Sequence, residues 1–98
     1  MEIQFANSDL DRLETDPAFA MGLAVPIVRA YRKRLQFIRS ALDERDFYTM
    51  KSWRFEKRKG KRQDQYSMRL NQQFRLIPEL LGSGRDKLVR ILGIEDYH

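Results

Sequence analysis

The segment from residue 53 to residue 75 constrains the fold most, because it joins a dense run of positive charge to a clear strand pattern. Residues 65–70 alternate between apolar and polar side chains, and alternation at period two is typical of a strand with one buried face. A second strand pattern, at residues 74–77, follows the turn-like sequence Asn71-Gln72-Gln73. The segment therefore predicts a β-hairpin that holds Arg75 close to the positive charge.

The positive charge is concentrated in this segment. Seven basic residues lie between Lys51 and Arg62, against one acid, Glu56. Residues 51–75 hold nine basic and two acidic residues, a balance of +7, whereas the whole chain carries +5 and the remainder therefore about −2. Aromatic residues interleave with these cations in a strand-like pattern and not along an amphipathic helix. This distribution favours binding to nucleic acid over binding to a membrane surface.

The first half of the chain has helical patterns after a short strand. Residues 2–6 predict an edge strand, and Asn7 or Ser8 is suited to cap a helix that ends near Glu14. Residues 26–44 predict the main helix, because their apolar residues recur at helical spacing. This apolar stripe consists of Ile27, Tyr31, Leu35, Ile38 and Leu42. The basic residues of the same helix are interpreted as a solvent-exposed outer face and not as an RNA contact; they are Arg29, Arg32, Lys33 and Arg39.

The second half of the chain predicts strands at residues 53–58, 65–70 and 74–80. Pro78 cannot donate to a ladder, so the third of these strands is expected at a sheet edge or to end there. Residues 82–86 form a turn, and residues 88–94 have the pattern of a central strand buried on both faces. The 98 residues make one domain. We expect an α+β fold in which the N-terminal strand and two helices pack on one face of an antiparallel sheet.

The composition excludes several kinds of site. The chain has no cysteine and one histidine, so it lacks a disulfide framework and the usual ligands of a transition metal. The longest apolar run, residues 18–28, contains Gly22 and Pro26 and is too short to span a bilayer. No secretion signal opens the sequence. We therefore expect a cytoplasmic protein that needs no metal, cofactor or membrane.

Five short motifs follow one another in the second half of the chain. They are Trp53-Arg54-Phe55, Lys59-Gly60-Lys61-Arg62, Tyr66-Ser67-Met68-Arg69-Leu70, Phe74-Arg75-Leu76 and Asp96-Tyr97-His98. In this order and spacing the chain resembles the HigB toxins of the RelE/ParE superfamily. The resemblance covers residues 50–98 well and the remainder in outline. Two positions depart from the family pattern, because Arg58 replaces a usual leucine and Pro78 a usual apolar strand residue.

The resemblance implies a RelE-like fold similar to that of microbial ribonucleases and the activity of a type II toxin that cuts messenger RNA in the ribosomal A site. It also implies a cognate antitoxin, a HigA-like helix-turn-helix protein, and contact with operator DNA only through the complex with that antitoxin. By position, Lys59 matches the family's turn lysine and Arg75 its strand arginine. Tyr97 and His98 match the terminal pair.

Cleavage of RNA without a metal, by attack of the neighbouring 2′-hydroxyl, needs a proton carrier surrounded by cations. His98 is the candidate carrier, because histidine has an unperturbed pKa of about 6.5. Lys59 and Arg75 are assigned to the phosphate. Three roles are open for Tyr97: it stacks on an RNA base, it forms a hydrogen bond near the scissile bond, or it only packs against the protein. The tail that carries Tyr97 is expected to leave the regular sheet. Binding of the RNA backbone is assigned to Lys57, Arg58, Lys61, Arg62 and Arg69.

Three functions remain open at this point. The first is a ribosome-dependent messenger-RNA endonuclease, and the second is a ParE-like protein that poisons DNA gyrase by binding. The third is a small basic RNA-binding protein without activity. Cleavage sites mapped on messenger RNA after induced expression would separate the first from the other two, and DNA-damage signalling would identify the second. Trp53 and Phe55 are expected in the core, and Ser67 is expected to be an ordinary strand residue.

Overall fold

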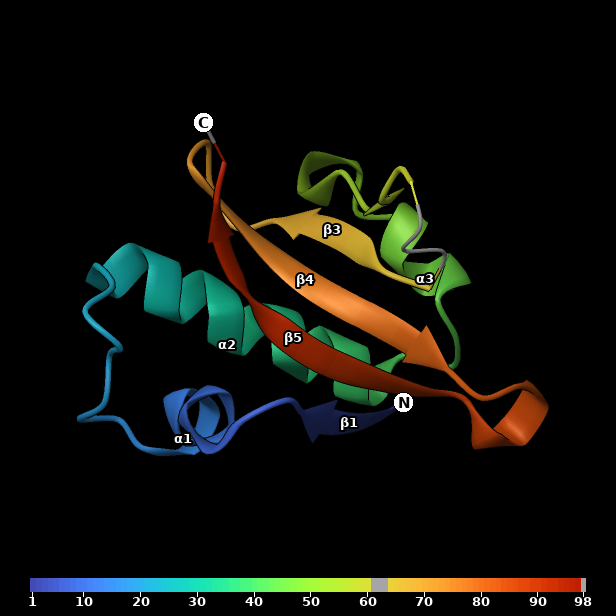
Figure 1. Ribbon diagram of the computed structural model, residues 1–98, viewed down its shortest axis with the longest axis horizontal. Coiled ribbons are helices and arrows are strands. Elements are labelled where there is room, and N and C mark those ends of the chain that lie inside the picture. The colour runs from blue at the N-terminus through green and yellow to red at the C-terminus, as the bar shows by residue number, and fades with distance from the viewer. Residues whose placement is uncertain (61–63, 98) are drawn as a thin grey trace.

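The computed structural model describes residues 1–60 and 64–97, and within them five strands form one sheet in the order β1-β5-β4-β3-β2 (Figure 1). The strands are β1 (Glu2–Phe5), β2 (Glu56–Lys57), β3 (Tyr66–Arg69), β4 (Phe74–Leu81) and β5 (Leu88–Asp96). Strand β1 lies at one edge and is parallel to β5, whereas the other neighbours are antiparallel. The prediction of an edge strand at the N-terminus is confirmed.

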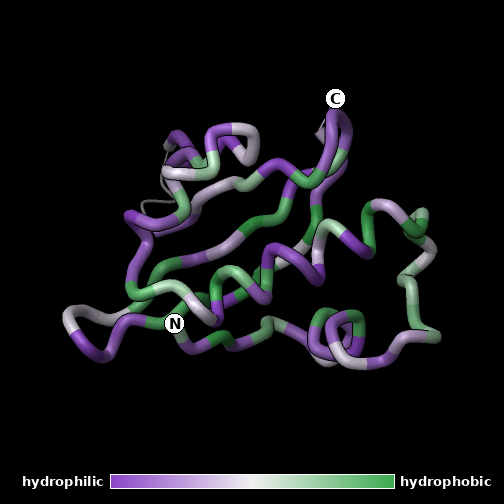
Figure 2. The backbone as a smooth tube through the Cα atoms, turned by 180° about the vertical axis from the view of Figure 1, so that it is seen from behind, coloured by the Kyte–Doolittle hydropathy of each residue, from purple (hydrophilic) through white to green (hydrophobic). Residues whose placement is uncertain are grey.

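The helices are α1 (Ser8–Thr15), α2 (Val25–Ser40) and α3 (Arg45–Tyr48), with two short 3-10 helices, η1 (Lys51–Trp53) and η2 (Gly84–Asp86). Helix α2 lies across the sheet with α1 beside it, as the front and rear views show (Figures 1 and 2). One core cluster joins both helices to the strands. The predicted α+β architecture with helices on one face is confirmed. Within residues 1–60 and 64–97, no helix has the length and apolar character needed to cross a lipid bilayer.

Helix α1 begins as the sequence predicts. The side-chain oxygen of Asn7 accepts a hydrogen bond from the backbone N–H of Leu10 at 3.0 Å, which satisfies one of the free donors at the helix start. Leu10 and Leu13 are fully buried. The buried stripe of α2 faces them, and it includes Ile27, Tyr31, Leu35 and Ile38.

Helix α2 ends at Ser40, before the predicted end at residue 44. The backbone N–H of Leu42 is bonded to Asp46 Oδ2 at 3.0 Å instead of to a helical carbonyl. Asp43 Oδ1 likewise accepts a hydrogen bond from the Arg45 N–H at 2.8 Å. Short acidic side chains thus compete with the helical backbone bonds and divert the chain into α3. As a result Leu42, which was predicted in the buried stripe, is 91% exposed.

The predicted strand at residues 53–58 is wrong over most of its length. Trp53 ends η1, and Arg54 has a left-handed backbone conformation with φ 46° and ψ 56°. Only Glu56–Lys57 pair with β3. Trp53 and Phe55, on either side of the left-handed residue, both lie in the core, which confirms the prediction that these two aromatic residues are buried.

Pro78 lies inside the sheet and not at an edge. Strand β4 runs between β3 and β5, and Pro78 is fully buried within it. The register with β5 shifts at this point: Ile77 pairs with Gly93 but Pro78 pairs with Ile91, which leaves Leu92 unpaired. A β-bulge interrupts the ladder where Pro78 has no N–H to donate, and for this reason the expected edge position was wrong.

Strand β5 is an interior strand, as predicted, but it is buried on one face only. Val89 and Ile91 are fully buried, whereas Arg90 between them is partly exposed. Helices α1 and α2 cover one face of the sheet, so the prediction of burial on both faces was wrong. The strand continues to Asp96, and Tyr97 then leaves it, as expected for the tail.

We predict that Tyr31→Phe lowers the free energy of unfolding by about 1 kcal/mol, because the Tyr31 hydroxyl donates a buried 2.6 Å hydrogen bond to the Leu10 carbonyl. Burial raises the pKa of this phenol far above its usual value, with smaller contributions from Glu14 and Asp11. The folded state therefore resists deprotonation. The free energy of unfolding of the wild type should fall as the pH rises above about 10. The difference in free energy of unfolding between the wild type and Tyr31→Phe should therefore become smaller.

Urea unfolding of both proteins between neutral pH and pH about 11 measures this difference. Tyr48→Phe is the control, because Tyr48 is half exposed and the structure shows no hydrogen bond from its hydroxyl within the described residues. Equal stability of the wild type and Tyr31→Phe at neutral pH would contradict the prediction.

Candidate functional site

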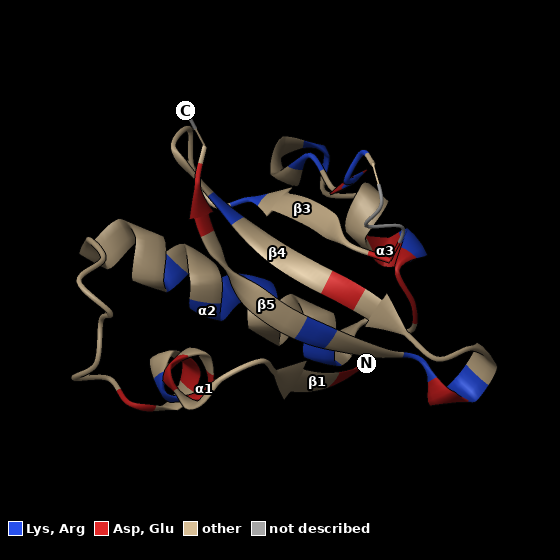
Figure 3. Ribbon diagram, in the orientation of Figure 1, with Lys and Arg blue, Asp and Glu red and all other residues tan. Residues whose placement is uncertain are grey.

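The face of the sheet opposite the helices carries a hollow of about 460 Å³. It is lined by residues from β2 and the loop after it, from β3 and β4, and from the end of the chain. The lining residues are Glu56, Lys57, Arg58, Lys59, Ser67, Arg75, Ile77, Glu95 and Tyr97. Figure 3 shows basic segments in the loop region beside β3 and at the start of β4. Four of the lining side chains are cationic and two are acidic.

Strand register determines which residues face this hollow. Met68 pairs with Leu76, and both are fully buried beneath α2. The next pair along the hairpin is Arg69 and Arg75, so these two arginines point to the opposite face. Glu95 of β5 pairs with Arg75 from the other side. One row across β3, β4 and β5 therefore presents two arginines and a glutamate on the open face.

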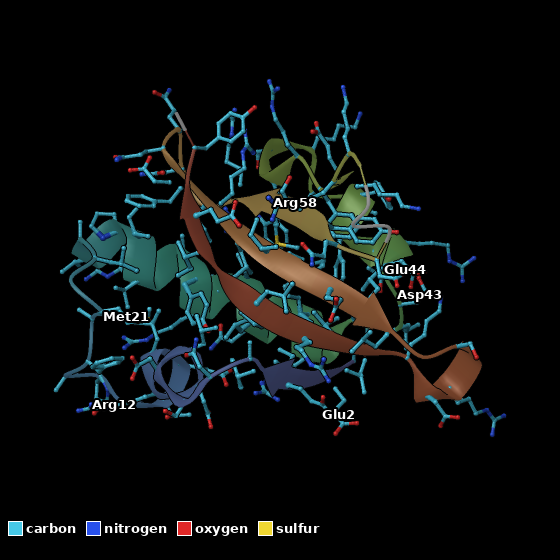
Figure 4. All side chains as sticks on the ribbon, viewed as in Figure 1. Glu2, Arg12, Met21, Asp43, Glu44 and Arg58 are labelled. Atoms are coloured by element: carbon cyan, nitrogen blue, oxygen red, sulfur yellow. The ribbon has the colours of Figure 1, made fainter. Side chains whose placement is uncertain are left out.

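Arg58 crosses the open face and pairs with Glu95. Its guanidinium nitrogens lie 3.0 and 3.2 Å from the two carboxylate oxygens of Glu95. Arg58 follows β2 and Glu95 lies in β5, and strands β3 and β4 run between them. At the usual strand spacing β2 and β5 are about 14 Å apart. Figure 4 shows the Arg58 side chain over this face of the sheet. Ile77 below it is 3% exposed although it does not belong to the core cluster, so the bottom of the hollow is apolar.

Tyr97 is held over Arg75. The centre of its ring lies 4.1 Å from the guanidinium carbon, a cation–π contact, and its backbone N–H donates to the Gln73 carbonyl at 2.6 Å. The hairpin turn that presents Gln73 is fixed by Asn71, whose side-chain oxygen accepts hydrogen bonds from the N–H groups of Gln73 and Phe74. The predicted hairpin thus carries Arg75 and also anchors the chain beyond β5.

Lys59 lies in the loop after β2, at the rim of the hollow. Gly60 follows with φ +94°, a conformation that glycine adopts far more easily than other residues. The loop is joined to β3 by a hydrogen bond of 2.9 Å from the Arg58 N–H to the Gln65 carbonyl. These two features fix where the chain leaves the sheet and so place Lys59 beside the other cations.

The structure brings most of the predicted site residues together. Lys57, Arg58, Lys59, Arg75 and Tyr97 all line the hollow. Arg69 lies opposite Arg75 but does not line the hollow, and its Nε is buried without a hydrogen-bond partner within the described residues. Lys61, Arg62 and His98 lie outside the described residues. Nowhere in residues 1–60 and 64–97 do three or more Asp, Glu or His side chains gather in a way that could hold a metal ion.

The whole chain superposes on the whole of a YoeB/ParE toxin from Agrobacterium tumefaciens, with a TM-score of 0.65 and 16% sequence identity. The fold is that of a YoeB/ParE toxin. The predicted RelE/ParE-type fold is therefore confirmed, whereas membership of the HigB branch stays a prediction. No protein-family model and no curated protein matches the chain in sequence.

On this toxin fold the sequence reasoning missed four residues of the hollow: Glu56, Glu95, Ser67 and Ile77. Ser67 was interpreted as an ordinary strand residue, but strand alternation already placed it on the same face as Arg69. Glu56 was counted only as the single acid in a basic run. Glu95 stands immediately before the terminal motif, and its role depends on the pairing of β5 with β4, which the sequence does not reveal.

We predict that a double-mutant cycle on Arg58→Ala and Glu95→Ala gives a coupling free energy of at most about 1 kcal/mol that decreases with added salt. The Glu95 side chain is 52% exposed, so solvent screens the pair despite its two hydrogen bonds. Urea unfolding of the four proteins at low and high ionic strength measures the coupling. If the two substitutions change the free energy of unfolding additively at low ionic strength, the ion pair does not link the β2 end of the sheet to β5 in solution.

Proposed function

We propose that this protein is a toxin of a type II toxin–antitoxin system that cleaves messenger RNA on the ribosome. The observation that carries the proposal is the cationic hollow on the open sheet face, where Lys59 and Arg75 lie together with Tyr97. His98, the next residue, is the proposed proton carrier. The fold, which is similar to that of a YoeB/ParE toxin, supports the proposal that the protein is a toxin. The motifs that resemble HigB toxins support the proposal that it cleaves messenger RNA on the ribosome.

The arrangement of the arginines supports binding of a phosphate. Like charges directly opposite each other on neighbouring strands are destabilising, and Arg69 and Arg75 are such a pair. An anion bound beside the two guanidinium groups would reduce their repulsion. Planar guanidinium groups suit a phosphate, because they donate hydrogen bonds in pairs.

The proposed reaction uses the 2′-hydroxyl of the RNA as the nucleophile. A base takes the proton of this hydroxyl, the 2′-oxygen bonds to phosphorus, and the bond from phosphorus to the 5′-oxygen breaks as an acid protonates that oxygen. The products are a 2′,3′-cyclic phosphate and a 5′-hydroxyl. Lys59 and Arg75 stabilise the charge on the phosphate, and His98 carries a proton. Tyr97, held over Arg75, limits where the RNA can lie.

The proposal assigns the alignment of the RNA to the ribosome. The hollow offers cations and few groups that would orient a 2′-hydroxyl, and orientation accounts for several kcal/mol of a reaction barrier. A messenger RNA held in the A site arrives already aligned, whereas free RNA should be cut poorly. The proposed antitoxin is a HigA-like helix-turn-helix protein, and the toxin reaches operator DNA only through it.

We predict that Lys59→Ala and Arg75→Ala each lower the cleavage rate by a factor of about 10² to 10³, because each removes a preorganised cation from the phosphate. His98→Ala should abolish cleavage and growth arrest without preventing ribosome binding. Each protein is induced without antitoxin, and cut messenger RNA is mapped at equal amounts of soluble protein. Arg90→Ala is the control, because Arg90 contacts Gln4 and Glu79 outside the hollow.

Several outcomes would overturn parts of this proposal. Cleavage by His98→Ala at near the wild-type rate would transfer the proton chemistry to Tyr97, Lys59 or Glu56. DNA-damage signalling without cut messenger RNA would identify the protein as a gyrase poison. Ribosome or RNA binding with neither effect would leave a binding protein without activity.

We also predict that Lys57→Ala lowers the dependence of RNA binding on salt, expressed as the slope of log K against log salt, by about 0.7, because one phosphate contact is lost. The exposed Lys57 lines the hollow, whereas the exposed Lys33 lies on α2 and serves as the control that leaves the slope unchanged. Affinities for single-stranded RNA are measured over a series of KCl concentrations. A change in the position of the cut sites for Lys57→Ala would instead mean that this residue reads bases.

A further inference from the structure

A second hollow, of about 260 Å³, adjoins the first one. It is lined by Tyr48, Met50, Lys51, Arg54, Phe55 and Glu56. Glu56 belongs to the walls of both hollows, so the two hollows meet at this residue of β2. None of the proposed chemistry uses this second hollow.

Tyr48 supplies an aromatic surface that faces solvent. Its side chain comes from α3 and is 53% exposed. The ring contacts Phe55 edge to face, with 4.9 Å between ring centres and 77° between planes. Phe55 is buried and stacks in parallel on Tyr66 at 4.7 Å. Packing on one side therefore holds the Tyr48 ring in place while the other side stays open.

Two exposed cations line the same hollow as this ring. Lys51 and Arg54 have no ion pair within the described residues. Arg54 is also one of two described residues other than glycine with positive φ, a backbone conformation that an arginine adopts rarely and at a cost. Glycine or asparagine would adopt it more easily. An arginine here combines strain in the backbone with a charge that has no partner in the described part of the chain.

From these features we infer that the second hollow binds a nucleotide of the same RNA strand that occupies the first hollow. The open side of the Tyr48 ring stacks on the base, and Lys51 and Arg54 contact the adjoining phosphate. Any base can stack on an aromatic ring, so the site adds affinity and fixes the position of the RNA strand, but it does not select a codon. Single-stranded RNA fits better than a duplex, because only unpaired bases expose a face for stacking. The inference rests on the proposed function, since it needs RNA in the first hollow.

The test measures binding without cleavage, so that it does not depend on the catalytic proposal. A short single-stranded 2′-O-methyl RNA, which has no free 2′-hydroxyl to attack, is titrated with the wild type, Tyr48→Phe, Tyr48→Ala and Arg54→Asn. Tyr48→Ala should weaken binding by about tenfold, whereas Tyr48→Phe should bind as the wild type does, because it keeps the ring. Arg54→Asn should weaken binding and lower the salt slope by about 0.7, with no loss of thermal stability, because asparagine accepts the left-handed conformation.

Two further probes identify stacking directly. A strand that contains 2-aminopurine should lose fluorescence on binding to the wild type and Tyr48→Phe but not on binding to Tyr48→Ala. An abasic strand of the same length should bind the wild type and Tyr48→Ala equally well. Unchanged affinity of Tyr48→Ala for the intact strand, or absence of RNA binding by the wild type, overturns the inference. Loss of binding in Tyr48→Ala supports it even if no messenger RNA is cut in cells, an outcome that would reject only the proposed reaction.

Discussion

Packing of α2 against one face of the sheet is the constraint on which the rest of the structure depends. Strand side chains alternate between two faces, so every residue committed to the core directs its neighbours to the other side. Met68 and Leu76 are buried beneath α2, and Arg69 and Arg75 are thereby held opposite each other on the open face. Such a pair repels and would not form by itself. The burial of apolar area under the helix thus provides the free energy that keeps two cations preorganised on the exposed side of the hairpin.

The irregular chain before β2 is also anchored in the core. Trp53 and Phe55 both enter the core, and Phe55 stacks on Tyr66 of β3. Between Trp53 and Phe55, Arg54 has a left-handed backbone conformation, and the chain reaches β2 from the 3-10 helix η1 and not from a longer strand. Backbone strain at one exposed residue is tolerated because the two buried aromatic side chains on either side contribute much more.

Local patterns predicted the elements, and long-range pairing decided the details of the site. Period-two alternation was enough for β3 and its hairpin with β4, and the Asn7 cap was enough for the start of α1. The early end of α2 could not be read from apolar spacing, because it depends on side-chain acceptors such as Asp43 and Asp46.

For the site, the motifs indicated that Lys59, Arg75 and Tyr97 belong together, and these three residues do line one hollow. The ion pair between Arg58 and Glu95 was not predictable, because it joins residues 37 positions apart across two intervening strands. The roles of the gathered residues stay predictions.

The carboxylates in the hollow bear on which anions can bind there. Arg58 is already paired with Glu95, so an anion that uses Arg58 must exchange for that carboxylate, and Glu56 adds a second negative charge between the two hollows. A ligand with one phosphate gains little from such an exchange. A polyanion that engages the Arg75 side and the Arg54 side together makes its second contact intramolecularly, at an effective concentration that a free anion does not reach. The two acids, Glu56 and Glu95, would therefore weaken the binding of small anions more than the binding of a strand with several phosphates.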